Sequence, residues 1–293
     1  MNVADAASRM LRRSLRLATP FIWPEAPVLN YHSVDNAGSL LSISTAALAA
    51  QLAHLQHQGW RSLSIAEYLG ATPQTDLRRR MLITFDDGYS NFCDQALPLL
   101  QRYGFTATLF VPVDYVGRRP TWLENNQAAA QLLLDQLGFS GRDRQLLNES
   151  MATLARAPLL GWPELRNLAA AGIDVQSHGA GHGFLTQQHP EEIAADLMRS
   201  RTVLEDRLGK PISTIAYPYG ACNSLTARLA QQAGFRAGFI SDFGPRDRAG
   251  LMRWRAGISA RITPAELHAM MVSWPIYPRL RCLARRVEVG RPA

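Results

Sequence analysis

Short apolar runs alternate with longer segments of helical periodicity along most of the chain. The runs are rich in β-branched and aromatic residues, which favour strands, and they lie at 28–32, 81–85, 106–111, 173–177, 214–219, 237–241 and 254–259. Helical spacing of apolar residues predicts helices between them, at 45–58, 92–103, 163–171, 191–208, 225–233 and 264–272. This alternation indicates parallel strands joined by crossover helices and predicts an α/β barrel of about seven units.

Segment 117–160 is longer than an ordinary crossover and mostly helical in pattern. We interpret it as an insertion over one mouth of the barrel, where it would shape a substrate groove. The chain has no internal repeat and no obvious linker, so we expect one barrel domain at 27–273. A basic extension at 1–26 and a basic tail at 274–293 would flank this domain.

Composition excludes several classes of protein. The 293 residues are 47% hydrophobic, enough for one large core. Cys93, Cys222 and Cys282 have no paired spacing, which argues against a disulfide framework or a thiolate zinc site and fits a reducing compartment. The formal charge of +7 favours anionic partners. Because the chain has no zinc finger or RNP motif, we expect that nucleic acid is not among these partners.

The N-terminal segment lacks the features of an export signal. Its apolar part at 15–23 is short, contains Pro20 and is followed by no small-residue cleavage site. No run of about 18 apolar residues predicts a transmembrane span. We therefore expect a cytoplasmic protein, with peripheral membrane contact through its basic termini as a further option.

Two adjacent carboxylates, Asp86 and Asp87, follow the apolar run 81–85 directly and precede Gly88. Neighbouring carboxylates repel each other, and barrels build active sites at the carboxyl ends of their strands, so stability alone explains the pair poorly. The structural alternative is that either aspartate caps the helix expected to begin near Asn91.

A second strand end supplies two imidazoles. His178 follows the run 173–177, and His182 comes four residues later in a glycine-rich segment that favours a tight loop. Two imidazoles and one carboxylate suit zinc, or less selectively cobalt or nickel, with positions left open for other ligands. The sequence therefore predicts a divalent metal site beside the aspartate pair.

These motifs, together with Tyr217-Pro218-Tyr219-Gly220, resemble the polysaccharide deacetylase family, which has the NodB homology domain and is also called carbohydrate esterase family 4. The resemblance spans 27–263 and combines specific motifs in the expected order. It implies a single distorted (β/α)7-type barrel with a helical insertion. It also implies that Asp86 is the general base and that Asp87, His178 and His182 bind the metal.

The third motif carries a further implication and one departure. By resemblance, the backbone N–H of Tyr219, beside Pro218, would contact the substrate's acyl oxygen. Many family members have an arginine two residues before this proline, where it orients the base, and this chain has Ala216 there. Arg253 or Arg255 could replace it, but we favour the interpretation that both are solvated or paired elsewhere.

The proton donor for the leaving amine is assigned by resemblance to one branch of the family. His32 ends the first apolar run, which looks like the N-terminal motif of the branch that deacetylates poly-N-acetylglucosamine, where the acid histidine comes first. We prefer it to His268, which lies in an amphipathic helical stretch. Asn30 and Tyr31, beside His32, are candidates for substrate contact.

Aromatic residues could line a sugar groove, because rings stack on the apolar faces of pyranoses. Tyr219 has the support of its motif, whereas packing is the favoured interpretation for Trp122 and Trp162.

The sequence therefore predicts a metal-dependent hydrolase that removes acetyl groups from the N-acetylated amino sugars of a glycan or lipid-linked saccharide. One alternative is a deformylase or an esterase that uses the same site. Another is a catalytically inactive carbohydrate-binding protein, which the missing motif arginine favours.

Overall fold

A computed structural model describes residues 26–36, 41–125, 141–241, 250–259 and 261–274. Seven parallel strands close into a barrel in the order β1, β10, β9, β8, β7, β6, β5 and back to β1. The strands are β1 (Val28–Tyr31), β5 (Arg80–Phe85), β6 (Thr108–Val111), β7 (Asp174–Ser177), β8 (Thr214–Ala216), β9 (Ala237–Ser241) and β10 (Arg253–Gly257). This confirms the predicted barrel.

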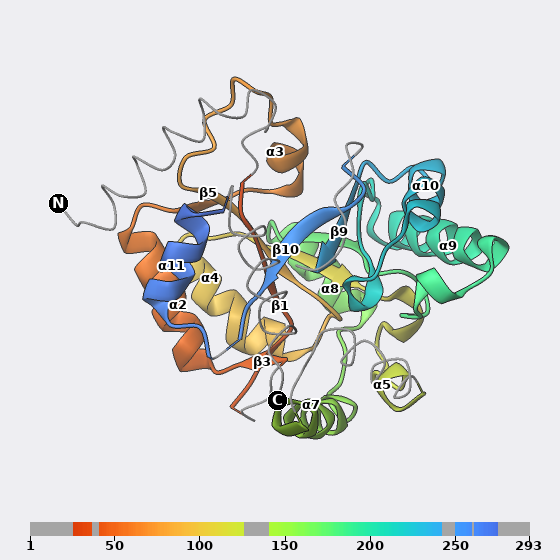
Figure 1. Ribbon diagram of the computed structural model, residues 1–293, viewed down its shortest axis with the longest axis horizontal. Coiled ribbons are helices and arrows are strands. Elements are labelled where there is room, and N and C mark those ends of the chain that lie inside the picture. Colours follow the sequence, from red (N-terminus) through yellow and green to blue (C-terminus); the bar gives the residue numbers. More distant parts are fainter. Residues whose placement is uncertain (1–25, 37–40, 126–140, 242–249, 260, 275–293) are drawn as a thin grey trace, which may run out of the picture.

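Helices surround the barrel, with α2, α4 and α11 on one side of the view in Figure 1 and α9 and α10 on the other. The main helices are α2 (Thr45–His57), α3 (Ile65–Gly70), α4 (Leu97–Arg102), α8 (Trp162–Ala170), α9 (Pro190–Leu208), α10 (Ser224–Gln232) and α11 (Pro264–Val272). None of the helices in these described ranges is long and apolar enough to cross a membrane.

Strand residues alternate between the barrel interior and the helical layer. One set, including Leu29, Ile83 and Leu109, joins the large core beneath the helices. The other set, including Leu82 and Phe110, joins a smaller cluster with residues of α3. Because both faces are covered, each barrel strand except β10 is a nearly continuous buried run, which is why the apolar pattern predicted these strands.

The segment between α2 and β5 contains elements that the sequence analysis did not predict. The short strand β4 (Arg61–Ser62) pairs with β5, and α3 follows it. A capping box between Ser64 and Glu67 begins α3. This S-x-x-E pattern was the available sequence signal, but the helix is only six residues long and shows no clear periodicity. The even shorter strands β2 (Ser33–Val34) and β3 (Ser42–Ile43) pair with each other beside the barrel.

Two predicted elements are shorter or less regular than expected, and a proline accounts for each. The predicted helix 92–103 is divided into a π-helical turn, η1 (Phe92–Ala96), and α4, because Pro98 cannot donate a backbone hydrogen bond. The predicted strand 214–219 ends at Ala216, where Pro218 begins a 3₁₀ turn, η4 (Pro218–Gly220).

The insertion contributes α5 (Trp122–Asn125) and α7 (Gly141–Leu154), and residues 126–140 lie outside the described ranges. Trp122 and Leu154 pack with Tyr89, which follows the aspartate pair. The insertion therefore lies at the barrel end where that pair is found. Of the expected extension and tail, residues 1–25 and 275–293 also lie outside the described part of the chain.

Candidate active site

The carboxyl ends of neighbouring strands bring His32 and Asp86 to the same level of the barrel. In the parallel pairing of β1 with β5, Tyr31 stands opposite Phe85, and the N–H of Asp86 donates to the carbonyl of Tyr31 at 2.9 Å. The next residue, Asp87, has a left-handed backbone with φ 70°. A non-glycine residue is strained there, which is typical of functional turns.

Gly88 completes this turn and has a second reason to be glycine. Its φ is 74°, and a Cβ at this position would lie 2.9 Å from Cγ1 of Val111. The close approach of β6 therefore fixes the path of the chain just after the aspartates.

Asp87 converges with two imidazoles that come from the end of β7 and the loop after it. Asp87 Oδ1 lies 3.4 Å from His178 Nε2 and 3.1 Å from His182 Nε2. All three side chains are buried, and their candidate ligand atoms lie within 4.8 Å of one another. Asp87 Oδ1 nevertheless has no aligned hydrogen bond.

This arrangement fits a bound cation. Ligand atoms about 2.1 Å from a tetrahedral zinc ion lie about 3.4 Å apart, close to the separations between Asp87 and the imidazoles. A buried carboxylate oxygen without a hydrogen bond is costly unless another group compensates its charge. The donor set of one oxygen and two nitrogens thus has the chemistry and spacing of a divalent metal site.

A hydrogen bond to a backbone carbonyl orients the imidazole of His178. His178 Nδ1 lies 2.7 Å from the carbonyl oxygen of Ala216, at the end of the adjacent strand β8. Donation from Nδ1–H to this carbonyl leaves the Nε2 lone pair directed at Asp87, the tautomer that metal ligation requires. Ala216, at the position of the motif arginine, thus contributes to the site through its backbone.

The loop that carries both histidines is held by α9. The two carboxylate oxygens of Asp196 accept from the N–H of Ala180 at 2.8 Å and from the N–H of Gly181 at 2.9 Å. His182 itself has a left-handed backbone, with φ 51°. Pro218 is buried and lies against this loop, where a Cβ on Gly179 would be 3.5 Å from its Cγ.

Aromatic rings enclose His182. The ring of Trp122 stacks on it with centroids 4.3 Å apart, and Tyr219 meets it edge-on at 4.9 Å. Tyr219 is half-buried, has φ 59° and lies parallel to Phe184 at 3.8 Å. The insertion therefore packs directly on one of the candidate ligands through Trp122, whereas Trp162 lies elsewhere, beneath the guanidinium of Arg207.

Arg255 binds the other aspartate, which corrects the expectation that both C-terminal arginines would be solvated or paired elsewhere. Its Nη1 donates to Asp86 Oδ1 at 2.6 Å and its Nη2 donates to Oδ2 at 2.7 Å. Arg255 is only 1% exposed, and Asn30 and Thr84 accept further hydrogen bonds from Nη1. The sequence could not show this pairing, because the partners are 169 residues apart.

The positive charge of Arg255 keeps the carboxyl group of Asp86 ionised. Burial raises the pKa of Asp86, but the positive charge of the Arg255 guanidinium outweighs this effect, so the pKa lies below its ordinary value. Asp86 Oδ2 is also 4.0 Å from His178 Nε2. An ionised carboxylate thus stands beside the candidate metal centre without being one of its three converging ligands.

The two candidate acid histidines lie in different places. The imidazole of His32 is close enough to both aspartates to lower their pKa. His268 instead accepts a hydrogen bond from Trp60 Nε1 at 3.3 Å and packs edge-on against His54. Its contacts thus join α11 to α2 and the adjoining loop.

Three lower-ranked candidates have structural partners. The hydroxyl of Tyr31 is buried and donates to Gln51, so we assign Tyr31 no substrate contact. Asn30 is buried and accepts from Arg255. Arg253 donates to the carbonyl of Gly250 and lies over the ring of Tyr68.

Known proteins resemble this chain in sequence. The sequence model described as "Polysaccharide deacetylase" matches residues 74–238. A putative polysaccharide deacetylase from Bacillus subtilis, YxkH, is 23% identical over 76% of this chain and 66% of its own length. A poly-beta-1,6-N-acetyl-D-glucosamine N-deacetylase from Escherichia coli O157:H7 is 22% identical over 80% of this chain, but over only 36% of its own length.

A solved structure of a deacetylase has a similar fold. The structure of the Streptococcus pyogenes deacetylase PplD in complex with acetate superposes with a TM-score of 0.66 and 22% identity, covering 85% of this chain and 99% of the other. At this identity the likeness shows a shared fold. The family model, in contrast, matches more than half of the sequence, and the chain belongs to the polysaccharide deacetylase family.

Proposed function

We propose that this protein is a metal-dependent amidohydrolase that removes acetyl groups from the N-acetylated amino sugars of a glycan or lipid-linked saccharide. The observation that carries the proposal is the contrast between adjacent carboxylates. Asp86 is ionised and held by Arg255. Asp87 has an unsatisfied oxygen directed at two imidazoles. A general base must be ionised to accept a proton, as Asp86 is. A metal ligand needs an oxygen that is free to bind the ion, as Asp87 has.

Asp87, His178 and His182 are the residues that would hold the ion. A divalent ion bound there would supply a Lewis acid for the acyl oxygen and would lower the pKa of a water. The mixed nitrogen and oxygen donor set leads us to propose zinc, with cobalt or nickel as alternatives. Trp122 and Tyr219 shield the His182 side of the site from solvent.

Asp86 and His32, which lie outside this ligand set, carry out the two proton transfers. Asp86 accepts a proton from the attacking water while the water oxygen adds to the amide carbon. The bidentate pairing with Arg255 leaves further lone pairs on both carboxylate oxygens for this step. The C–N bond breaks as His32 donates a proton to the departing nitrogen, giving acetate and a free amino sugar.

The names of the relatives support this class of substrate. One of them is named as a deacetylase of poly-beta-1,6-N-acetyl-D-glucosamine. The half-buried ring of Tyr219 lies beside His182 and stacks on Phe184, and we propose that its exposed part contacts a pyranose. We further propose that the backbone N–H of Tyr219 contacts the acyl oxygen.

Acetate and free-amine release from short N-acetylglucosamine oligomers tests the proposal. We expect release by the wild-type protein, loss on chelation and recovery on addition of zinc. Asp86→Asn should reduce the rate by about 10²–10⁴-fold and leave metal content unchanged. The exposed Asp206→Asn serves as the matched control. Activity that survives complete chelation would refute the metal-dependent mechanism.

The same assay separates the alternatives. Faster turnover of N-formyl or O-acetyl analogues than of N-acetyl oligomers would identify a deformylase or an esterase. Stoichiometric metal and oligomer binding without any release of acetate would instead indicate a carbohydrate-binding protein.

We also propose that the protein acts in the cytoplasm and contacts anionic membrane surfaces through its basic ends, which lie outside the described residues. Sedimentation with phosphatidylglycerol vesicles should capture the full chain. A protein lacking both ends should stay in the supernatant, and equal capture of both forms would refute this contact.

A further inference from the structure

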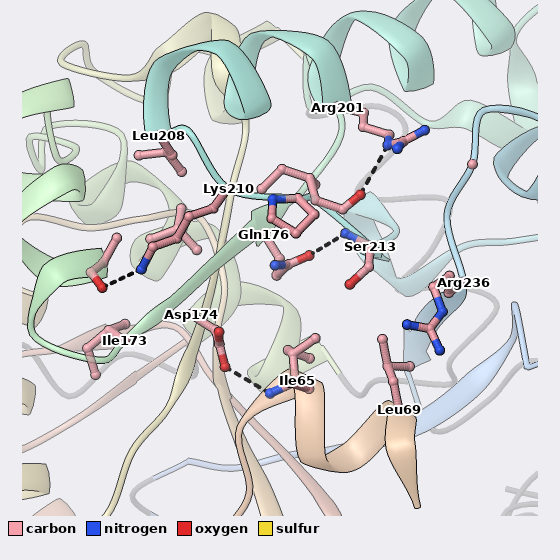
Figure 2. A pocket seen from close by; sticks show the side chains of 16 residues that line it. Ile65, Leu69, Ile173, Asp174, Gln176, Arg201, Leu208, Lys210, Ser213 and Arg236 are labelled. Atoms are coloured by element: carbon pink, nitrogen blue, oxygen red, sulfur yellow. Dashed lines mark hydrogen bonds between the residues drawn. The ribbon is translucent and has the colours of Figure 1, made fainter.

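A cavity lies at the opposite end of the barrel from Asp86. It has a volume of about 420 Å³ and is bounded by α3, by the first residues of β7 and by the segment that joins α9 to β8 (Figure 2). Asp174 begins β7 and lines this cavity, whereas His178 follows the other end of the same strand. At about 3.3 Å per residue the two residues are about 13 Å apart, so the cavity is distinct from the candidate active site.

A buried amide presents hydrogen-bond donors to this cavity. Gln176 is only 5% exposed, and its Oε1 accepts from the N–H groups of Ser213 and Thr214 and from the Thr214 hydroxyl, at 2.9–3.1 Å. Its NH₂ group has no acceptor among the described residues. In Figure 2 the amide oxygen points to Ser213 and the nitrogen faces the other way. A fully used oxygen beside two unused donors selects for a ligand that accepts hydrogen bonds.

With the Arg201–Glu205 pair counted as neutral, the charged residues that line the cavity carry one net positive charge. Arg201 pairs with Glu205, with 3.1 Å between Nη2 and Oε1. Burial raises the pKa of Asp174, and the N–H of Ile65 and the ammonium of Lys210 lower it in part. Lys210 itself donates to the carbonyl of Ala169 at 2.8 Å, and its positive charge offsets the negative charge of Asp174 in the lining. Arg236 forms no ion pair with any described residue, which leaves one positive charge at the cavity.

The remaining walls are apolar. Leu69 of α3, Ile173 before β7 and Leu208 at the end of α9 line the space. A volume of about 420 Å³ lies within the range of small-molecule sites, and an apolar lining with few polar groups is typical of them. A single inorganic anion would leave most of this surface uncovered.

We propose that this cavity binds a small amphiphilic anion, in which one carboxylate or phosphate group is joined to an apolar body. Gln176 donates to the anionic group, Arg236 balances its charge, and the apolar body lies against Leu69, Ile173 and Leu208. The site is independent of the deacetylase reaction proposed above.

Titration calorimetry of the full chain tests this proposal with benzoate and phenyl phosphate as probes. Benzamide provides the neutral control, and a chelator removes anion binding at the metal centre. We expect one of the two anions to bind with a dissociation constant of about 1 mM or tighter, and benzamide at least about tenfold more weakly. The preferred anion distinguishes a carboxylate ligand from a phosphate ligand.

Two substitutions locate the site. Gln176→Glu keeps the accepting oxygen for Ser213 and Thr214 but replaces the free NH₂ by a second anionic oxygen, so we expect anion affinity to fall at least about tenfold with folding intact. Arg236→Gln should weaken it by about fivefold. Arg207→Gln, which removes an arginine outside the cavity, should leave it unchanged.

The thermal melting curve of each variant verifies its folding. Absence of anion binding by the wild-type protein, equal affinity for benzamide, or unchanged affinity in both cavity variants would overturn the proposal.

Discussion

Asp86 and Asp87 are chemically identical neighbours whose different surroundings suit them to different tasks. Asp86 follows a barrel strand and receives two hydrogen bonds from Arg255, which itself lies inside the barrel over the ring of Phe110. Asp87, one residue later and in a left-handed conformation, faces the imidazoles instead. The left-handed conformation at Asp87 accompanies this difference, in which each carboxylate has its own partners.

Replacing Arg255 tests how much the fold depends on this buried pair. Arg255→Met leaves the Asp86 carboxylate buried without its partner, and we expect a loss of about 3–5 kcal/mol of unfolding free energy, measured by urea titration. Adding Asp86→Asn should restore much of that stability, because it removes the uncompensated charge. Additive losses in the double variant would show that the pair is not coupled in this way.

A parallel comparison tests the choice of proton donor. His32→Gln should lower the rate of acetate release by about 10²–10⁴-fold while metal content stays unchanged, because only the proton transfer is lost. His268→Gln should keep full activity and lose about 1 kcal/mol of stability with its hydrogen bond from Trp60. Full activity in the His32 variant together with a slow His268 variant would reverse the assignment.

At the scale of secondary-structure elements, α9 positions the loop that carries both candidate imidazole ligands, although it contributes no ligand itself. Asp196 on this helix holds two consecutive backbone N–H groups in the loop between His178 and His182. Asp114 in η2 (Val113–Tyr115) pairs with Arg199 one turn further along the same helix. The loop is thus fixed by side chains from outside the barrel, as expected for a site that needs both imidazoles at defined positions.

Asp196→Ala should weaken metal binding by about 10–100-fold, because the loop loses two charge-assisted hydrogen bonds that position the ligands. Calorimetric titration of the metal-free protein with zinc measures this effect. Faster hydrogen exchange at Ala180 and Gly181 should accompany it, a change that a purely global loss of stability would not confine to the loop. Asp206→Asn, on the exposed face of α9, is the control. Wild-type zinc affinity in the Asp196→Ala variant would contradict the assigned role.

For the molecule as a whole, the barrel could be predicted because most of its strands are short buried runs that alternate with helical segments. The strand ends also placed Asp86 and His178 correctly at one mouth, since parallel strands share their carboxyl ends. The side chains that hold these residues could not be predicted in the same way. Asp196 is a charged residue beside the buried stripe of α9, and Arg255 lies in a strand with only two buried residues, so the local pattern shows the partner of neither.

The same limit explains the missed contacts of Tyr89 and Trp122. Tyr89 is buried next to the aspartate turn, and Trp122 reaches His182 from the insertion. Their aromatic character indicated burial, but the surface against which they pack is created only when the insertion closes on the barrel mouth.

Metal binding should stabilise the whole fold, because the three proposed ligands join the turn after β5 to the loop after β7. At free zinc about 100 times its dissociation constant, linkage predicts about 2.7 kcal/mol of added stability, or about 5–10 °C in Tm for a domain of this size. Scanning calorimetry with zinc and with a chelator measures the difference.

Asp87→Asn should abolish the zinc-dependent shift, whereas Asp86→Asn should retain it. An equal shift in both variants would mean that zinc binds elsewhere, and loss of the shift in both would mean that Asp86 is itself a ligand. The two neighbouring carboxylates can thus be assigned separate roles without any measurement of turnover.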